Sequence, residues 1–188
     1  MPVISAHAIF QLELVPVIDN RIGEQIIFIH GLEGSSQGVK ASLLRGLFPE
    51  ILTPDFPGSL EQRMAQLNGI LGGRRNWIMI GSSLGGLMAA MFTIQHPDQV
   101  KRLVLLAPAL IWPDFAVNSP EPVYVPTIIY HGKQDTVVPL TPVRELAEGV
   151  FRKLKFYAVD DDHGLYKTVH AIDWPALLEI QPMHPSES

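Results

Sequence analysis

The chain has 188 residues, of which 47% are hydrophobic and 18% are charged, and its formal net charge is −5. This length suits one domain with a single core, and the composition excludes an extended disordered protein. The net negative charge, with basic residues only in short interrupted groups, excludes an electrostatic footprint for nucleic acid. Because cysteine is absent, a disulfide framework, a thiolate zinc site and a cysteine nucleophile are also excluded.

Short apolar runs predict the strands. The first segment, Val3–Asp19, alternates around Ala8–Val15 and predicts one or two antiparallel edge strands. Six further runs are β-branched or apolar: Gln25–His30, Ile51–Thr53, Trp77–Gly81, Arg102–Ala107, Thr127–His131 and Lys155–Val159. Most of these six show no alternation, as expected for parallel strands that are covered on both faces.

The segments between these runs predict helices. Three of them cover Lys40–Phe48, Leu60–Leu71 and Leu84–Gln95, and two more run from a Thr141 cap to about Gly149 and from an Asp173 cap to Ile180. The third helix stops before Pro97 because proline cannot continue a helix. The alternation predicts an α/β fold with a mostly parallel central sheet flanked by helices on both faces, in one domain that spans residues 1–188.

One uncharged run is long enough to raise the question of a membrane span. From Trp77 to Ile94 there are 18 residues without a charge, about the minimum for a span. Glycines and serines occupy its centre, and Asn76 and Gln95 flank it, so a buried strand that turns into a buried helix explains it better. The start, MPVISAHAIF, lacks the pattern of a secretory signal. We therefore predict no membrane span and expect a cytoplasmic protein.

A proline-rich stretch, PALIWPDFAVNSPEPVYVP at residues 108–126, is unusually apolar for a loop. A loop of this length in a compact domain is usually functional, and we interpret it as a short lid-like segment. Its aromatic residues Trp112, Phe115 and Tyr124 either form an apolar wall for a substrate or pack in the core beneath the loop. Nineteen residues are too few for a helical cap domain, so we expect an open site.

The residues that follow the predicted strands carry the candidate chemistry. The first parallel strand leads into HGLEGSS, the next into SSLGG, a later one into HGKQD and the last into DDDHG. Ligands of open parallel sheets bind beyond the carboxyl ends of the strands. A glycine-rich loop, a serine, an aspartate and a histidine are therefore expected at one edge of the sheet.

In these motifs the sequence resembles the α/β-hydrolase family, from Gln25 to the last helix. GSSLG matches the nucleophile elbow G-x-S-x-G at Gly81, Ser83 and Gly85. The nucleophile of this motif sits on a sharp turn, where side chains two residues before and after it would collide. Ser83 has glycine at both positions, whereas Ser82 has Ile80 and Leu84 there.

The resemblance implies a role for four further residues. Asp135 in HGKQD resembles the acid of the triad, and His163 in DDDHG resembles the general base. HGLEG resembles the oxyanion loop, in which the backbone N–H of Leu32 would act with that of Leu84. The family chemistry needs neither a cofactor nor a metal ion.

Several alternatives compete with these assignments. Asp114 is a rival for the acid, since some hydrolases place it after the preceding strand, and His170 is a rival for the base. The run Asp160–Asp162 could suggest a metal site, but consecutive side chains rarely converge on one ion, so an acidic turn in water is the better interpretation. We interpret His30 and His131 as residues that shape loops through hydrogen bonds.

The resemblance thus predicts a small, nearly capless serine hydrolase similar to bacterial esterases and thioesterases. Its substrate would be a small acyl ester or thioester, cleaved through an acyl-enzyme on Ser83. A non-hydrolytic ligand-binding or interaction protein on the same fold is the alternative, because a fold does not fix a function.

Overall fold

The computed structural model describes residues 25–116 and 121–180. Five strands form a parallel sheet whose spatial order is the order of the chain. They are β1 (Gln25–Ile29), β2 (Trp77–Ser82), β3 (Val100–Leu106), β4 (Thr127–Gly132) and β5 (Leu154–Val159). The predicted edge strands in Val3–Asp19 lie outside the described residues.

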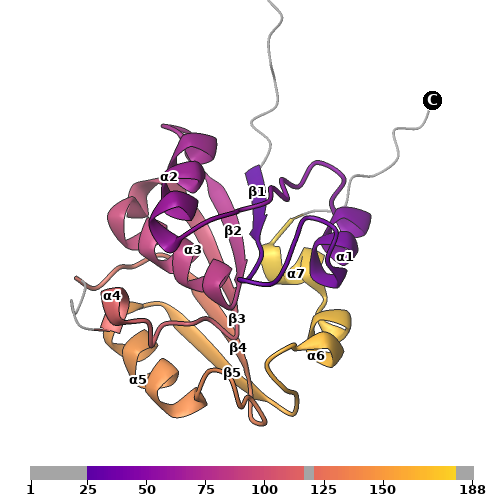
Figure 1. Cartoon of the computed structure of the whole chain (residues 1–188), viewed down its shortest axis with the longest axis vertical. Coiled ribbons are helices and arrows are strands. Elements are labelled where there is room, and N and C mark those ends of the chain that lie inside the picture. Colours follow the sequence, from indigo (N-terminus) through magenta and orange to yellow (C-terminus); the bar gives the residue numbers. More distant parts are fainter. Residues whose placement is uncertain (1–24, 117–120, 181–188) are drawn as a thin grey trace, which may run out of the picture.

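Helices cover both faces of this sheet, as Figure 1 shows. On one face lie α2 (Leu60–Leu71), α3 (Leu84–Gln95), α4 (Pro113–Ala116) and α5 (Leu140–Val150). On the other lie α1 (Val39–Leu47), α6 (Tyr166–Ala171) and α7 (Trp174–Leu178), and a short 3-10 helix, Pro97–Gln99, precedes β3. The predicted fold class, a parallel sheet between two helical layers, is confirmed.

Successive side chains of each strand enter the two cores in turn. In β1, Ile27 and Ile29 pack with the helices of one face, whereas Ile26 and Phe28 pack with those of the other. Because both faces are covered, every residue of β2 is buried, and a side chain such as isoleucine gains about 1.5–3 kcal/mol from burial. Edge strand β5 instead alternates between half-buried and exposed residues.

Two local predictions were wrong. Ile51–Thr53 forms no strand: Leu52 alone bridges to Ile27 at the outer edge of β1, because Pro54, which has no N–H, follows at once. Thr141 is not a helix cap, since α5 begins at Leu140 after Pro139. By contrast, the predicted cap at Asp173 is confirmed, with its carboxylate accepting from Ala176 N–H at 3.2 Å.

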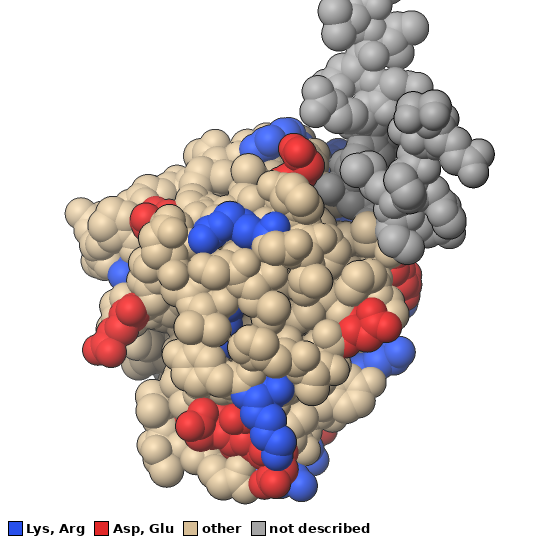
Figure 2. All heavy atoms as spheres, turned by 90° about the vertical axis from the view of Figure 1, so that its right-hand side faces the viewer, with Lys and Arg blue, Asp and Glu red and all other residues tan. Residues whose placement is uncertain are grey.

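The surface and the apolar segments bear on two further predictions. Figure 2 looks onto the face of α1, α6 and α7, where basic and acidic side chains lie interspersed. The uncharged run from Trp77 to Ile94 folds as β2, a tight turn and α3, all of them in the core region. Among the described residues, no helix has both the length and the apolar character that crossing a membrane requires.

Candidate active site

The turn between β2 and α3 holds Ser83 in a strained backbone conformation, with φ 54° and ψ −117°. A Cβ added to Gly81 would lie 2.5 Å from the Gly85 carbonyl oxygen, and one added to Gly85 would lie 2.1 Å from the Ile29 carbonyl oxygen. Both glycines are therefore required by sterics. Ser82 is the last residue of β2 and is buried, so Ser83 is the serine that faces the partners described next.

A chain of hydrogen bonds links Ser83, His163 and Asp135. His163 Nε2 lies 3.0 Å from Ser83 Oγ, and His163 Nδ1 lies 2.8 Å from Asp135 Oδ2. With Nδ1–H donating to the carboxylate, Nε2 is left to accept the serine hydroxyl proton. Three residues from the ends of three strands, far apart in sequence, thus meet at the carboxyl edge of the sheet.

The Asp135 carboxylate is fully buried and well supplied with donors. Its Oδ1 accepts the backbone N–H groups of Val137 at 2.9 Å and Val138 at 2.8 Å. Burial acts to raise the pKa of Asp135, but the hydrogen bonds from Val138, His163 and Val137 outweigh burial and the pKa is lowered. Asp135 is therefore ionised at neutral pH and keeps the proton on Nδ1 of His163.

A second histidine, His131, supports the same turn. Its Nε2 lies 2.9 Å from the carbonyl oxygen of Val138 and 3.2 Å from Oδ2 of Asp135. Burial lowers the pKa of His131, more strongly than the Val138 hydrogen bond and the Asp135 charge raise it, so the ring is neutral and donates through Nε2–H. The expectation that His131 shapes a loop is confirmed, whereas its closeness to Asp135 was not predicted.

The loop after β1 approaches Ser83 closely. A Cβ on Gly31 would lie 3.1 Å from the Ser83 Cβ, which is tighter than most real contacts. His30 is buried and shapes this loop as expected: its Nδ1–H donates to Gly31 O at 2.7 Å and its Nε2 accepts Phe56 N–H at 3.1 Å. Among the described residues, no acceptor binds the N–H of Leu32 or of Leu84.

Arg63, a residue that the sequence did not point to, anchors this loop from α2. Its side chain is buried, with Nε donating to Gly58 O at 2.9 Å and Nη2 donating to Leu32 O at 3.3 Å. Its Nη1 is buried without a hydrogen-bond partner in the described part of the chain. A positive charge is thus fixed beside the loop that carries Leu32.

The rival residues lie elsewhere or are committed to other partners. His170 is exposed in α6, and its Nδ1 donates to Tyr166 O, one turn earlier in the same helix. Asp114 lies in α4, and its side chain is not among those described. Asp160, Asp161 and Asp162 accept from different groups: Gln134 Nε2, Thr168 and the Gly164 N–H respectively.

The structure also places the aromatic residues of the proline-rich stretch. Phe115 is 3% exposed and lies in the core, whereas Trp112 and Tyr124 are exposed. Between residues 108 and 126, α4 is the one helix of the described part, and no helical cap of described residues covers the site. Within the described ranges, no group of three or more His, Asp or Glu side chains could hold a metal ion.

The family model described as the alpha/beta hydrolase fold matches residues 25–125, more than half of the chain. The chain belongs to the α/β hydrolase family. A 34-residue segment, 18% of this chain and 8% of the relative, is 47% identical to a "Probable 1-acylglycerol-3-phosphate O-acyltransferase" of Oryza sativa subsp. japonica. The chain thus spans a small fraction of that curated relative.

Solved structures of other hydrolases share the architecture. The structure described as that of a "predicted CIB-like hydrolase" from Thermoplasma acidophilum is 22% identical with a TM-score of 0.69, over 87% of this chain and 90% of its own. A monoacylglycerol lipase of Paleococcus ferrophilus is 17% identical with a TM-score of 0.62, over 82% of this chain and 92% of its own. At these identities the likeness shows the fold alone.

Proposed function

We propose that this α/β hydrolase is a serine hydrolase that cleaves carboxylic esters or thioesters through an acyl-enzyme. Ser83 Oγ attacks the acyl carbonyl carbon while His163 Nε2 takes the hydroxyl proton. Asp135 orients the imidazole and stabilises the imidazolium that forms. His163 then gives the proton to the departing alcohol or thiol, and a water molecule, activated by His163, releases the acid from Ser83.

The observation that carries this proposal is the unbroken chain from Ser83 through His163 to Asp135, with distances of 3.0 and 2.8 Å. These are the distances that a general base needs to reach a nucleophile. The strained backbone of Ser83 adds support, because such strain persists where a side chain must be presented. The fold shared with a monoacylglycerol lipase also fits an ester substrate.

The oxyanion of the tetrahedral intermediate would be bound by the N–H groups of Leu32 and Leu84. Both amides lack an acceptor among the described residues, and Leu84 is the first residue of α3, whose N-terminus favours negative charge. The buried guanidinium of Arg63 adds a positive charge on the Leu32 side. We further propose one domain in which residues 108–126 act as a short lid and leave the site open.

The test is active-site labelling with a fluorophosphonate, combined with turnover of p-nitrophenyl acetate, butyrate and octanoate. Ser83→Ala should abolish labelling and turnover, whereas its neighbour Ser82→Ala serves as the matched control and should keep most of both. Asp135→Asn should lower kcat by up to about 10⁴-fold, because an amide at this position no longer holds the histidine in the required tautomer. The reverse result for the two serines would refute the assignment.

The same assay separates hydrolysis from binding. Labelling of Ser83 without turnover of any of these esters, or of an acyl thioester tested beside them, would favour a non-hydrolytic binding protein. His170→Ala should cost far less activity than His163→Ala, since the His170 ring is tied to its own helix. Equal losses would leave the proton acceptor unassigned and contradict the proposed role of His163.

A further inference from the structure

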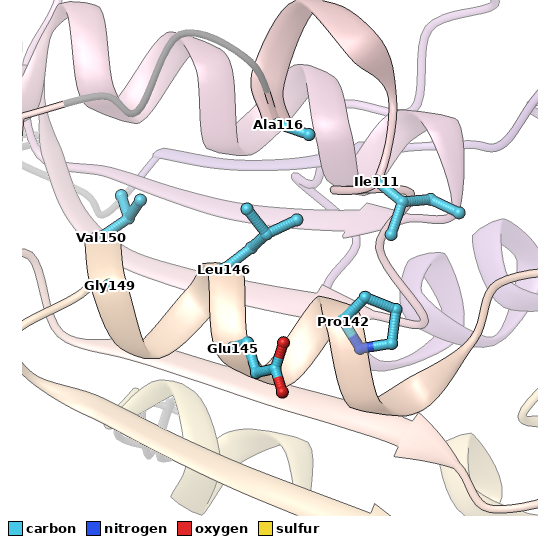
Figure 3. Close-up of a pocket in the computed structure, with 7 residues that line it drawn as sticks. All are labelled: Ile111, Ala116, Pro142, Glu145, Leu146, Gly149 and Val150. Carbon is cyan, nitrogen blue, oxygen red and sulfur yellow. The ribbon is translucent and has the colours of Figure 1, made fainter.

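An open groove with a volume of about 580 Å³ lies between α4 and α5. Figure 3 shows its two walls: Ile111 and Ala116 on one side, and α5 on the other. The lining residues are Ile111, Ala116, Pro142, Glu145, Leu146, Gly149 and Val150. This volume lies within the range of roughly 300–1,000 Å³ that is typical of small-molecule sites.

One end of the groove lies at the carboxyl edge of the sheet, the edge that also carries the elbow. The Ala109 N–H donates to the Ser83 carbonyl oxygen at 3.1 Å, so the segment that leads to Ile111 is hydrogen-bonded to the nucleophile turn. On the opposite wall, Pro142 follows the turn that binds Asp135 through Val137 and Val138. In Figure 3 the strand arrows point toward the end where Ile111 and Pro142 lie, which is the carboxyl edge of the sheet.

The groove then leads away from that edge along α5. From Pro142 to Val150 the helix rises by about 12 Å, at 1.5 Å per residue. The lining is apolar apart from Glu145, which is exposed. An apolar wall of this length, with no side-chain hydrogen-bond donor, fits a neutral hydrocarbon chain, and the carboxylate of Glu145 disfavours a chain that ends in a negative charge.

We propose that this groove holds the acyl chain of the substrate, so that the enzyme prefers unbranched esters of medium chain length; this proposal rests on the proposed ester hydrolysis at Ser83. The acyl side is assigned for a geometric reason. The departing alcohol must lie beside His163, which is followed by α6 on the other face of the sheet. The groove between α4 and α5 lies on the opposite face, where the acyl chain is left to extend.

The experiment measures kcat/KM for p-nitrophenyl acetate, butyrate, octanoate and dodecanoate, in the unmodified protein and in two groove variants. Gly149→Leu and Ala116→Phe place a larger side chain on opposite walls. A Cβ at Gly149 meets nothing within 4 Å, so the fold accepts it. Each variant should lower the ratio of octanoate to acetate kcat/KM by about tenfold or more, as expected when a few methylene groups lose their contacts.

Gly69→Leu is the matched control. Gly69 lies near the end of α2, is equally open to a Cβ, and does not line the groove, so its chain-length profile should equal that of the unmodified protein. A parallel series of acetate esters with lengthening alcohols tests the other side of the ester. A preference for long alcohols that Gly149→Leu abolishes would overturn the acyl assignment.

The outcomes also separate this proposal from the one on which it rests. If acetate is turned over through Ser83 but octanoate is not preferred, or if the groove variants leave the profile unchanged, the groove proposal is wrong and the hydrolase proposal stands. If no ester is turned over and Ser83 is not labelled, the proposed hydrolysis itself fails.

Discussion

The Nε2 atom of His131 lies 3.2 Å from the Oδ2 atom of Asp135, on the same carboxylate oxygen that accepts the hydrogen bond from His163. The His131 ring also binds the carbonyl of Val138, whose own N–H donates to Asp135. His131 is fully buried and therefore fixes the turn that positions the carboxylate from within the fold.

Loss of the His131 donor should reduce catalysis more than it reduces binding. His131→Phe leaves the buried Val138 carbonyl without a donor, and we expect kcat to fall by about tenfold to a hundredfold, because a lost hydrogen bond of this kind is worth roughly 1–3 kcal/mol. His131→Gln, which can still donate, should recover part of the loss. Steady-state kinetics with p-nitrophenyl butyrate measures kcat and KM. Equal kcat in His131→Phe and His131→Gln would argue against a positioning role.

Replacing glycine by alanine should change the free energy of unfolding in opposite directions at Gly85 and at Gly69. In Gly85→Ala the new Cβ would lie 2.1 Å from the Ile29 carbonyl oxygen, so the free energy of unfolding should fall by about 3 kcal/mol or more. In Gly69→Ala the Cβ meets nothing, and the helix should gain about 0.5–1 kcal/mol. Urea unfolding of both variants measures the two changes. Similar stabilities would show that the elbow tolerates a side chain at position 85.

The buried guanidinium of Arg63 should matter for the rate. Arg63→Met removes the donor to Leu32 O and the charge beside the loop, and we expect kcat to fall by about tenfold, on the scale of one lost charged hydrogen bond. Arg63→Lys keeps the charge but not the forked geometry, so its kcat should lie between that of the unmodified protein and that of Arg63→Met. Kinetics is paired with urea unfolding, because a loss of stability at unchanged kcat would mean that Arg63 supports only the fold.

The turn that carries His163 should lose stability in acid. Asp161 Oδ2 accepts from the backbone N–H and the hydroxyl of Thr168, each at 2.8 Å, and so ties the end of β5 to α6. Burial acts to raise the pKa of Asp161, but the Thr168 and Asp162 hydrogen bonds and the Lys167 charge outweigh it, so the pKa is lowered from its ordinary value of 3.8.

A carboxylate with a lowered pKa stabilises the fold above its ordinary pKa, and this stabilisation is lost as the pH falls through the lowered value. Asp161→Asn should therefore lower the free energy of unfolding at neutral pH by about 0.5–1 kcal/mol, since solvent screens this only partly buried carboxylate, and the difference from the unmodified protein should shrink below about pH 4. Urea unfolding across a pH series measures this difference. A gap that stays constant down to pH 2 would contradict the role of the Asp161 charge.

Local constraints explain which features could be predicted from the sequence. The bounds of α2 and α3 match the predicted ones because apolar spacing, Ser59 as a cap and Pro97 as a stop all act within one turn. The glycine before Ser83 was also readable, since the Cβ of residue 81 would meet Gly85 in the same turn. The requirement for glycine at position 85 comes from a distant strand, because a Cβ there would clash with the carbonyl oxygen of Ile29 at the end of β1.

Features that arise from tertiary packing could not be predicted from the sequence. Arg63 reaches Leu32 across 31 positions of sequence, and no motif marks it. The three aromatic residues of the proline-rich stretch were expected either at a substrate wall or in the core, and burial divides them, with Phe115 inside. The wall of the groove that α5 provides is formed mostly by apolar residues, and their spacing is that of any amphipathic helix.

The left-handed backbone of Ser83 has a consequence for evolution and for engineering. A non-glycine residue at φ 54° and ψ −117° costs the folded protein on the order of 1–3 kcal/mol, which glycine at the same position would largely avoid. The most stable version of this chain at position 83 is therefore expected to be an inert one. Selection for stability alone would remove the serine, so under the proposed role of Ser83 as nucleophile the chain gives up stability at this position in exchange for reactivity.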